Sequence, residues 1–144
     1  MIDETALPSW PARRRQPETL RLRAVMPGLS VTDLERSLAW YRDILGFVVS
    51  EEARRGDELV AVQLKAGKVR LLLERDPDPD RRRARGEGVR LYLATRQQVD
   101  RLAVAIQQRG GEIEQAPAES HEGRDFSLVD PDGYRITIFW RPES

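Results

Sequence analysis

Turn glycines recur in this chain at an almost constant spacing. Gly46 and Gly111 each precede a short run typical of a strand, and they lie 65 positions apart. Gly67 and Gly133 also precede strand-like runs, and they lie 66 positions apart. An offset shared by two independent turns indicates an internal repeat. We therefore expect the chain to fold as two copies of one supersecondary unit.

The first copy combines one amphipathic helix with four strands. Thr32 and Glu35 match the ends of a capping box, in which Thr32 would accept a hydrogen bond from the Glu35 amide. Gly46 is placed to end the helix in the left-handed conformation. The helix is predicted from four apolar residues at helical spacing, namely Leu34, Leu38, Tyr41 and Leu45. Strands are predicted at 24–31, 47–52, 58–65 and 69–75.

The second copy repeats this order. Thr95 and Gln98 match a second capping box, and the following helix is predicted to end at Gly110 and Gly111. Its apolar stripe consists of Val99, Leu102, Ala103 and Ile106. Strands are predicted at 89–94, 112–115, 125–129 and 134–140. The expected fold class is therefore α+β, built from two β-α-β-β-β modules.

The length of 144 residues suits one ordinary domain, which we place at 23–141. The first module is expected at 23–75 and the second at 88–141. The linker, 76–87, carries two prolines and blocks of opposite charge, which resist burial. Residues 1–22, with three prolines and a run of three arginines, are expected to form an irregular arm.

Composition excludes several classes of function. The charge is balanced, with 24 basic and 24 acidic residues, which argues against a dedicated nucleic-acid binder. The chain has no cysteine, so thiolate metal sites and cysteine nucleophiles are impossible. It has a single histidine, His121, so a site that needs two histidines cannot form within one chain. No apolar run is long enough to span a bilayer, and the N-terminus does not read as a secretory signal. A cytoplasmic protein without membrane contact is expected.

The last predicted strand has two different faces. It follows an Asp-Pro-Asp-Gly turn at 130–133. Alternation places one apolar set, Tyr134, Ile136, Ile138 and Trp140, on the buried face. The opposite face carries a cation, a hydroxyl and a ring, from Arg135, Thr137 and Phe139. The same reasoning places Arg70, Leu72, Glu74, Arg90 and Tyr92 on the faces that point away from the helices.

Two stretches resemble the vicinal oxygen chelate superfamily, which includes glyoxalase I, extradiol dioxygenases, and fosfomycin- and bleomycin-resistance proteins. The stretches are LSVTDLERSLAWYRDILGFVV at 29–49 and HEGRDFSLVDPDGYRITIF at 121–139, and the resemblance extends over 23–141. It implies two modules whose sheets curl into a U around a cavity, and commonly a homodimer. In metal-dependent members, His, Glu or Gln side chains on the first, fourth, fifth and eighth strands hold one divalent ion.

This chain departs from that ligand pattern. The position of the first-strand histidine falls on Met26, and that of the last-strand glutamate on Thr137. A thioether and a neutral hydroxyl are poor ligands for Mn²⁺, Ni²⁺ or Zn²⁺. Glu74 is the one candidate ligand among the four positions, so no metal cofactor is expected. The position of Pro27, two residues before Leu29, resembles the pattern of the bleomycin-resistance branch more than that of the metal-dependent branch. Members of the bleomycin-resistance branch bind a drug without metal at the dimer interface.

The expected ligand cavity is lined by the residues that face away from the helices, namely Met26, Arg70, Glu74, Arg90, Tyr92, Arg135, Thr137 and Phe139, with Gly28 and Leu72 among them. Arg90 and Arg135 suit a carboxylate or phosphate. The alternative is an ionic cluster in which Glu74 pairs with Arg70, Arg90 or Arg135. His121 is either a general acid or base or an exposed loop residue.

These observations favour a homodimeric small-molecule-binding protein without a catalytic metal, whose ligand is aromatic, anionic or peptide-like. One alternative is a metal-dependent lyase, isomerase or dioxygenase of the same superfamily. A second alternative is an interaction module that docks through the arm at 1–22. The residues alone leave open whether the chain catalyses a reaction.

Overall fold

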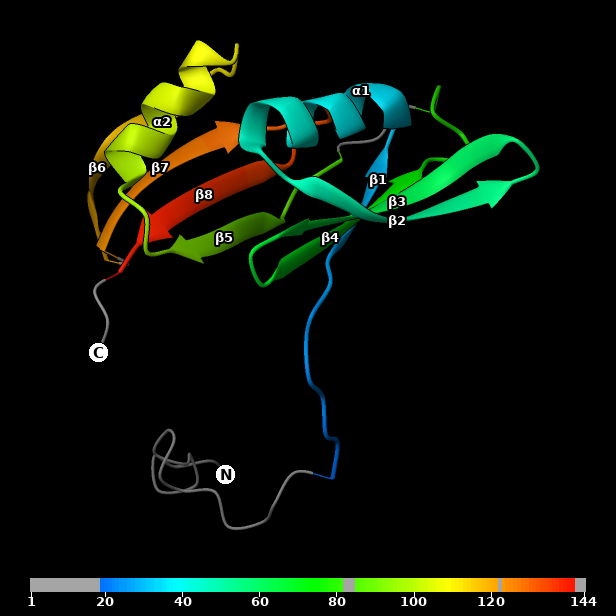
Figure 1. Ribbon diagram of the computed structural model, residues 1–144, viewed down its shortest axis with the longest axis horizontal. Helices are drawn as coiled ribbons and strands as arrows, with labels where there is room; N and C mark the ends of the chain where they lie inside the picture. Colours follow the sequence, from blue (N-terminus) through cyan, green and yellow to red (C-terminus); the bar gives the residue numbers. More distant parts are fainter. Residues whose placement is uncertain (1–18, 82–84, 122, 142–144) are drawn as a thin grey trace, which may run out of the picture.

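Two four-stranded sheets lie side by side, and the helices cover the same side of both (Figure 1). This is the computed structural model of the chain, and it describes residues 19–81, 85–121 and 123–141. Most of the arm predicted at 1–22 falls outside these ranges. The two mixed sheets, each with helical cover on one face, confirm the predicted α+β fold.

The first sheet has the strand order β1-β4-β3-β2. The parallel pair is β1 with β4, and the other pairs are antiparallel. Its strands are β1 (Gly28–Val31), β2 (Val48–Arg55), β3 (Glu58–Ala66) and β4 (Val69–Arg75). Its helical cover is α1 (Leu34–Ala39), which continues as the π-helical segment η2 (Trp40–Leu45). Gly46 ends this segment with φ 101°, in the left-handed conformation that was predicted.

The predicted capping box at Thr32 is wrong. Asp33 caps α1 instead, because its carboxylate accepts a hydrogen bond from the Arg36 amide at 3.1 Å. The hydroxyl of Thr32 donates to Asp132 at 2.7 Å, one hundred residues further along the chain. A long-range partner has therefore taken the side chain that local reasoning assigned to the helix.

The second sheet repeats the arrangement with the order β5-β8-β7-β6. Its strands are β5 (Arg90–Thr95), β6 (Gln115–Ser120), β7 (Gly123–Val129) and β8 (Arg135–Trp140), and its helix is α2 (Val99–Gln108). The second capping box is also wrong, since the Thr95 hydroxyl accepts from the Gln97 amide rather than that of Gln98. Strand β6 begins three residues later than predicted, and its pairing with β7 is irregular next to Pro117, which has no amide to donate.

The hydrophobic core lies between each sheet and its helical cover. Helix-facing side chains of the strands are buried, among them Val31 of β1, Leu71 and Leu73 of β4, and Ile136 of β8. Trp140, predicted on the buried face, ends β8 and is 38% exposed. The face of each sheet that points away from the helices is called here the open face. Within the described ranges, no helix is long and apolar enough to cross a membrane.

Candidate functional site

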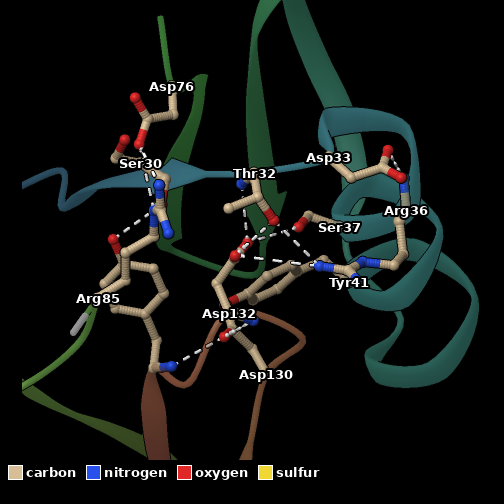
Figure 2. A network of polar contacts seen from close by, with 11 residues as sticks. Ser30, Thr32, Asp33, Arg36, Ser37, Tyr41, Asp76, Arg85, Asp130 and Asp132 are labelled. Carbon is tan, nitrogen blue, oxygen red and sulfur yellow. Dashed lines mark hydrogen bonds and ion pairs between the residues drawn. The ribbon is translucent and has the colours of Figure 1, made fainter. Parts of the chain in front are cut away.

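An inter-module clasp joins the two modules at the Asp-Pro-Asp-Gly turn (Figure 2). We define the clasp as Asp130 and Asp132 of the turn together with Thr32, Ser37 and Tyr41 of the first module. Its side chains cross from the turn to the end of β1 and to the α1–η2 segment. The clasp therefore sets how the second sheet sits beside the first.

Asp130 is the buried half of the turn. One carboxylate oxygen accepts from the amides of Asp132 and Tyr134, at 2.9 and 2.8 Å. The other accepts from the hydroxyl of Tyr41 at 2.8 Å. Burial raises the pKa of Asp130 above its ordinary value, although these hydrogen bonds oppose the shift. Burial, with the nearby Asp130 carboxylate, also raises the pKa of Tyr41, which keeps the phenol protonated as a donor.

Asp132 ties the turn to the end of β1. Its carboxylate accepts from the Thr32 amide at 3.1 Å and from the Thr32 hydroxyl at 2.7 Å. Ser37 is fully buried, and its hydroxyl lies 3.5 Å from the same carboxylate. The hydroxyl of Tyr134 adds a bond to the carbonyl of Ser30 at 2.9 Å. These contacts join residues about one hundred positions apart.

The end of the linker is fastened to the same region. Arg85 forms an ion pair with Asp76, and both side chains are largely buried. Gly86 follows with φ 79°, and a Cβ atom there would lie 2.8 Å from the carbonyl oxygen of Gly133. Only glycine allows this close approach of linker and turn. The start of β5 is thereby held beside the start of β8.

On the first sheet, Arg70 and Glu74 are exposed on the open face, and Met26 is 43% exposed in the segment before β1. A Glu74 carboxylate oxygen occupies the space over Gly28, 2.7 Å from where a Cβ would be. Among the described residues, Glu74 pairs with none of the three arginines that the ionic-cluster alternative named. That alternative is not what this chain forms by itself.

On the second sheet, five predicted residues share the open face. In the register of β5 and β8, Arg90 is opposite Arg135, and Tyr92 is opposite Thr137. Tyr92 is 53% exposed, whereas Thr137 is buried, and the Thr137 hydroxyl has no hydrogen-bond partner among the described residues. Phe139 is half-buried on the same strand, where Arg141 lies 5.5 Å from its ring centre.

The eight predicted residues therefore form two groups on two sheets. Arg70 and Glu74 belong to the first sheet, with Met26 in the segment that leads into it, and the other five belong to the second. Both open faces point away from the helical layer (Figure 1). His121 lies apart from both groups, exposed in the turn between β6 and β7.

The open-face side chains do not fit a divalent ion. Of the residues at the expected ligand positions, Met26 offers a thioether, and Thr137 offers a hydroxyl that is buried. Glu74 is the one carboxylate, and a hard cation needs several oxygen or imidazole donors around it. No group of three or more His, Asp or Glu side chains suited to a metal occurs in the part of the chain that is described.

Sequence reasoning missed two hollows. One, of about 890 Å³, lies between the modules on the helix side and is lined by residues of η2, the β3–β4 turn, β5, α2 and β8. The other, of about 500 Å³, lies where the linker meets β5 and β8; its lining consists of Arg85, Gly86, Glu87, Gly88, Val89, Arg90, Gly133 and Arg135. The run Arg-Gly-Glu-Gly at 85–88 was the available signal, but it spans the predicted boundary between the linker at 76–87 and the second module at 88–141.

Paired β-α-β-β-β modules, with helices on one side and open faces on the other, define a class of small α+β proteins. A sequence model of the Glyoxalase/Bleomycin resistance protein/Dioxygenase superfamily matches residues 21–138. The chain belongs to this superfamily, which confirms the resemblance inferred from its sequence. None of the curated proteins that were compared matches the chain.

Solved structures share the fold at low identity. TnmS3, an antibiotic binding protein from Streptomyces sp. CB03234, is 23% identical with a TM-score of 0.68, covering 85% of this chain and 99% of its own. UcmS2 is 20% identical with a TM-score of 0.68, covering 83% and 98%. Lactoylglutathione lyase from Agrobacterium tumefaciens is 20% identical with a TM-score of 0.62, covering 83% and 95%. These likenesses concern the fold alone.

Proposed function

We propose that this protein binds a small organic molecule on its open faces and does so without a catalytic metal. The observation that carries the proposal is the composition of the second open face. Tyr92 and Phe139 offer rings, and Arg90 and Arg135 offer charge-assisted donors at the start of the same strands. Apolar bodies with a few convergent polar groups are typical of small-molecule sites. The description of TnmS3 as an antibiotic binding protein supports such a use of the fold.

A homodimer completes this proposal. Strands β1 and β5 each have one neighbour in their sheets, so each leaves an edge available for pairing. Apolar side chains are exposed beside these edges, with Met26 at 43%, Val89 at 47% and Tyr92 at 53%. A second copy that laid its first open face over the second open face of this chain would bury them and enclose a cavity. The protein would act in the cytoplasm.

The test compares ligand binding with metal content in untagged full-length protein. We expect substoichiometric metal by elemental mass spectrometry after dialysis against Ni²⁺, Mn²⁺ or Zn²⁺. A screen of aromatic, anionic and peptide-like compounds should raise the melting temperature, and Tyr92→Ala should remove that stabilisation. Val104→Ala, which truncates an exposed apolar residue on α2, is the matched control. One tightly held metal per chain, or no stabilising compound, would refute the proposal.

A second candidate is metal-dependent lyase chemistry, and a lactoylglutathione lyase is among the solved structures that share the fold. The observation in its favour is Glu74, whose carboxylate lies on the open face without a partner among the described residues. An assay with methylglyoxal and glutathione in the presence of Ni²⁺, Zn²⁺ or Mn²⁺ tests this reaction. Turnover that Glu74→Gln abolishes would favour the lyase, and absence of turnover would leave the binding function.

A further inference from the structure

Two arginines lie side by side at the start of the second open face. Arg90 is the first residue of β5, Arg135 is the first residue of β8, and the two are register partners in the parallel pair. Their side chains therefore project from the same face of neighbouring strands. Like charges in such positions repel each other unless an anion lies between them.

The two arginines differ in how they are held. One terminal nitrogen of Arg135 donates to both carboxylate oxygens of Glu114, at 2.7 and 2.8 Å. This contact orients the guanidinium and leaves its other donors unengaged among the described residues. Arg90 is exposed, and its side chain has no hydrogen bond or ion pair within the described ranges. Glu114 therefore holds the Arg135 guanidinium in place, whereas the Arg90 guanidinium is available to contact a ligand.

The hollow of about 500 Å³ opens directly between these arginines and the end of the linker. Its residues include three arginines and, within the described part of the chain, one carboxylate, Glu87. Arg85 is paired with the buried Asp76 and Arg135 with Glu114, so Arg90 is the lining arginine without an ion pair among the described residues. Gly86, Gly88 and Gly133 line the hollow without side chains, and Glu87 and Val89 complete its lining.

The loop at 85–88, which lines one side of the hollow, is held in place by contacts with the rest of the fold. The Arg85–Asp76 ion pair anchors its first residue, and the next residue, Gly86, lies against the turn at Gly133. The amide of Val89 closes the loop by donating to the carbonyl of Gly86 at 3.1 Å. A wall held in this way, beside Arg90 and the remaining donors of Arg135, suits a planar or tetrahedral oxyanion, which arginine binds through paired hydrogen bonds.

We propose that this hollow, bounded by Arg90, Arg135 and the 85–88 loop, is an anion subsite that receives the carboxylate or phosphate group of the ligand. The inference rests on the proposed function and narrows its ligand to an anionic molecule. The aromatic part of that ligand would lie toward Tyr92, the next residue of β5 on the same face. Neutral and cationic molecules of the same shape would then bind more weakly.

The experiment uses full-length protein and three probes that share one ring, namely benzoate, phenyl phosphate and phenol, with affinities from isothermal titration calorimetry. Arg90→Gln should weaken the better anionic probe by about tenfold or more and leave phenol unchanged. Arg90→Lys should restore part of the loss. Arg101→Gln is the matched control, since Arg101 is an exposed arginine on α2, away from the open faces and without a partner among the described residues. The ratio of benzoate to phenyl phosphate affinity distinguishes the two oxyanions.

Each other outcome overturns a defined part of the proposal. If phenol binds as well as the anions, or Arg90→Gln has no effect on them, the anion subsite is wrong while small-molecule binding stands. If Arg90→Gln changes the mass measured by sedimentation velocity, Arg90 serves an interface between copies, and the subsite is again wrong. If no probe binds and the wider screen is also negative, both the subsite and the proposed function fail.

Discussion

Asp130 links the Asp-Pro-Asp-Gly turn to the first module through a buried carboxylate. It is 4% exposed and accepts hydrogen bonds from two amides and from the hydroxyl of Tyr41. Three donors favour the ionised carboxylate, but removal from water disfavours it, and the second effect prevails because the pKa of Asp130 is raised. The fold therefore holds a proton on this residue more tightly than the unfolded chain does.

This raised pKa predicts a pH dependence of stability. From about pH 4, the usual value for an unfolded aspartate, the folded state retains the proton longer than the unfolded state. The contribution of Asp130 to the free energy of unfolding must then fall as the pH rises through the raised pKa, and stay level above it. Urea unfolding of the wild type and of Asp130→Asn, at steps from pH 4 to 8, measures this contribution as the difference between the two.

We expect that difference to shift against the wild type as the pH rises across the lower part of the range. Asp57→Asn, which removes a carboxyl from the exposed turn between β2 and β3, controls for the loss of one negative charge. A difference that is flat, or that shifts in favour of the wild type, would contradict the assignment.

Local patterns predicted where the first helix begins but not which side chain caps it. Thr32 and Asp33 are neighbours with similar capping ability, and the pattern Thr-x-x-Glu favoured Thr32. The structure uses Asp33 because Asp132 holds the hydroxyl and amide of Thr32. A partner one hundred residues away does not appear in any local pattern, so this kind of error follows from tertiary contacts.

At the scale of elements, the linker is a structural part of the second module rather than a spacer. Its last residues contact the turn before β8 so closely that Gly86 has no room for a side chain. Composition alone favoured a solvated loop, because prolines and charges dominate 76–87. The structure contradicts that interpretation near both ends of the loop, because Asp76 and Arg85 form a buried ion pair. Charge pairing across nine positions was not visible in the charge blocks of the sequence.

Gly86→Ala should destabilise the fold more than an ordinary glycine substitution does. The new Cβ atom would meet the Gly133 carbonyl oxygen at 2.8 Å, and alanine also resists φ 79°. Gly56→Ala is the matched control, because Gly56 has φ 62° but nothing within 4 Å of its Cβ position. We expect Gly86→Ala to cost about 1–3 kcal/mol more than Gly56→Ala in urea unfolding. Equal costs would mean that the linker moves away from the turn without penalty.

At the scale of the whole molecule, the sequence predicted the two modules, their order of elements and the faces of the inner strands. These features depend on periodicity and on turn glycines, which are local. The relative placement of the modules could not be predicted, because it depends on the clasp. Tyr41 was expected in the core, and its hydroxyl is the donor to Asp130. The helical spacing of Tyr41 predicted its burial but did not predict that Asp130 would accept a hydrogen bond from its hydroxyl.

The clasp should make the two modules unfold together. Asp132→Ala removes the acceptor of the Thr32 amide and hydroxyl, and we expect a loss of about 1–3 kcal/mol. Trp40 lies in the first module and Trp140 in the second, so a Trp10→Phe background with one or the other retained reports each module separately. The two fluorescence transitions should coincide with Asp132 present and separate in Asp132→Ala.

Asp33→Ala is the control for this comparison, since it removes a helix cap within the first module and leaves the contacts between modules intact. The Asp33 variant should lose stability with both transitions still together. Coincident transitions in Asp132→Ala would show that other contacts couple the modules.

The clasp also has a consequence for the order in which the protein is made. Tyr41 leaves the ribosome 89 residues ahead of Asp130, and Thr32 one hundred residues ahead of Asp132. At typical rates of synthesis this interval is about 5–20 s, far longer than a helix or a hairpin needs to form. During this interval the hydroxyls of Thr32 and Tyr41 do not yet have their carboxylate partners in the turn. The turn at 130–133 is the segment whose translation completes the clasp.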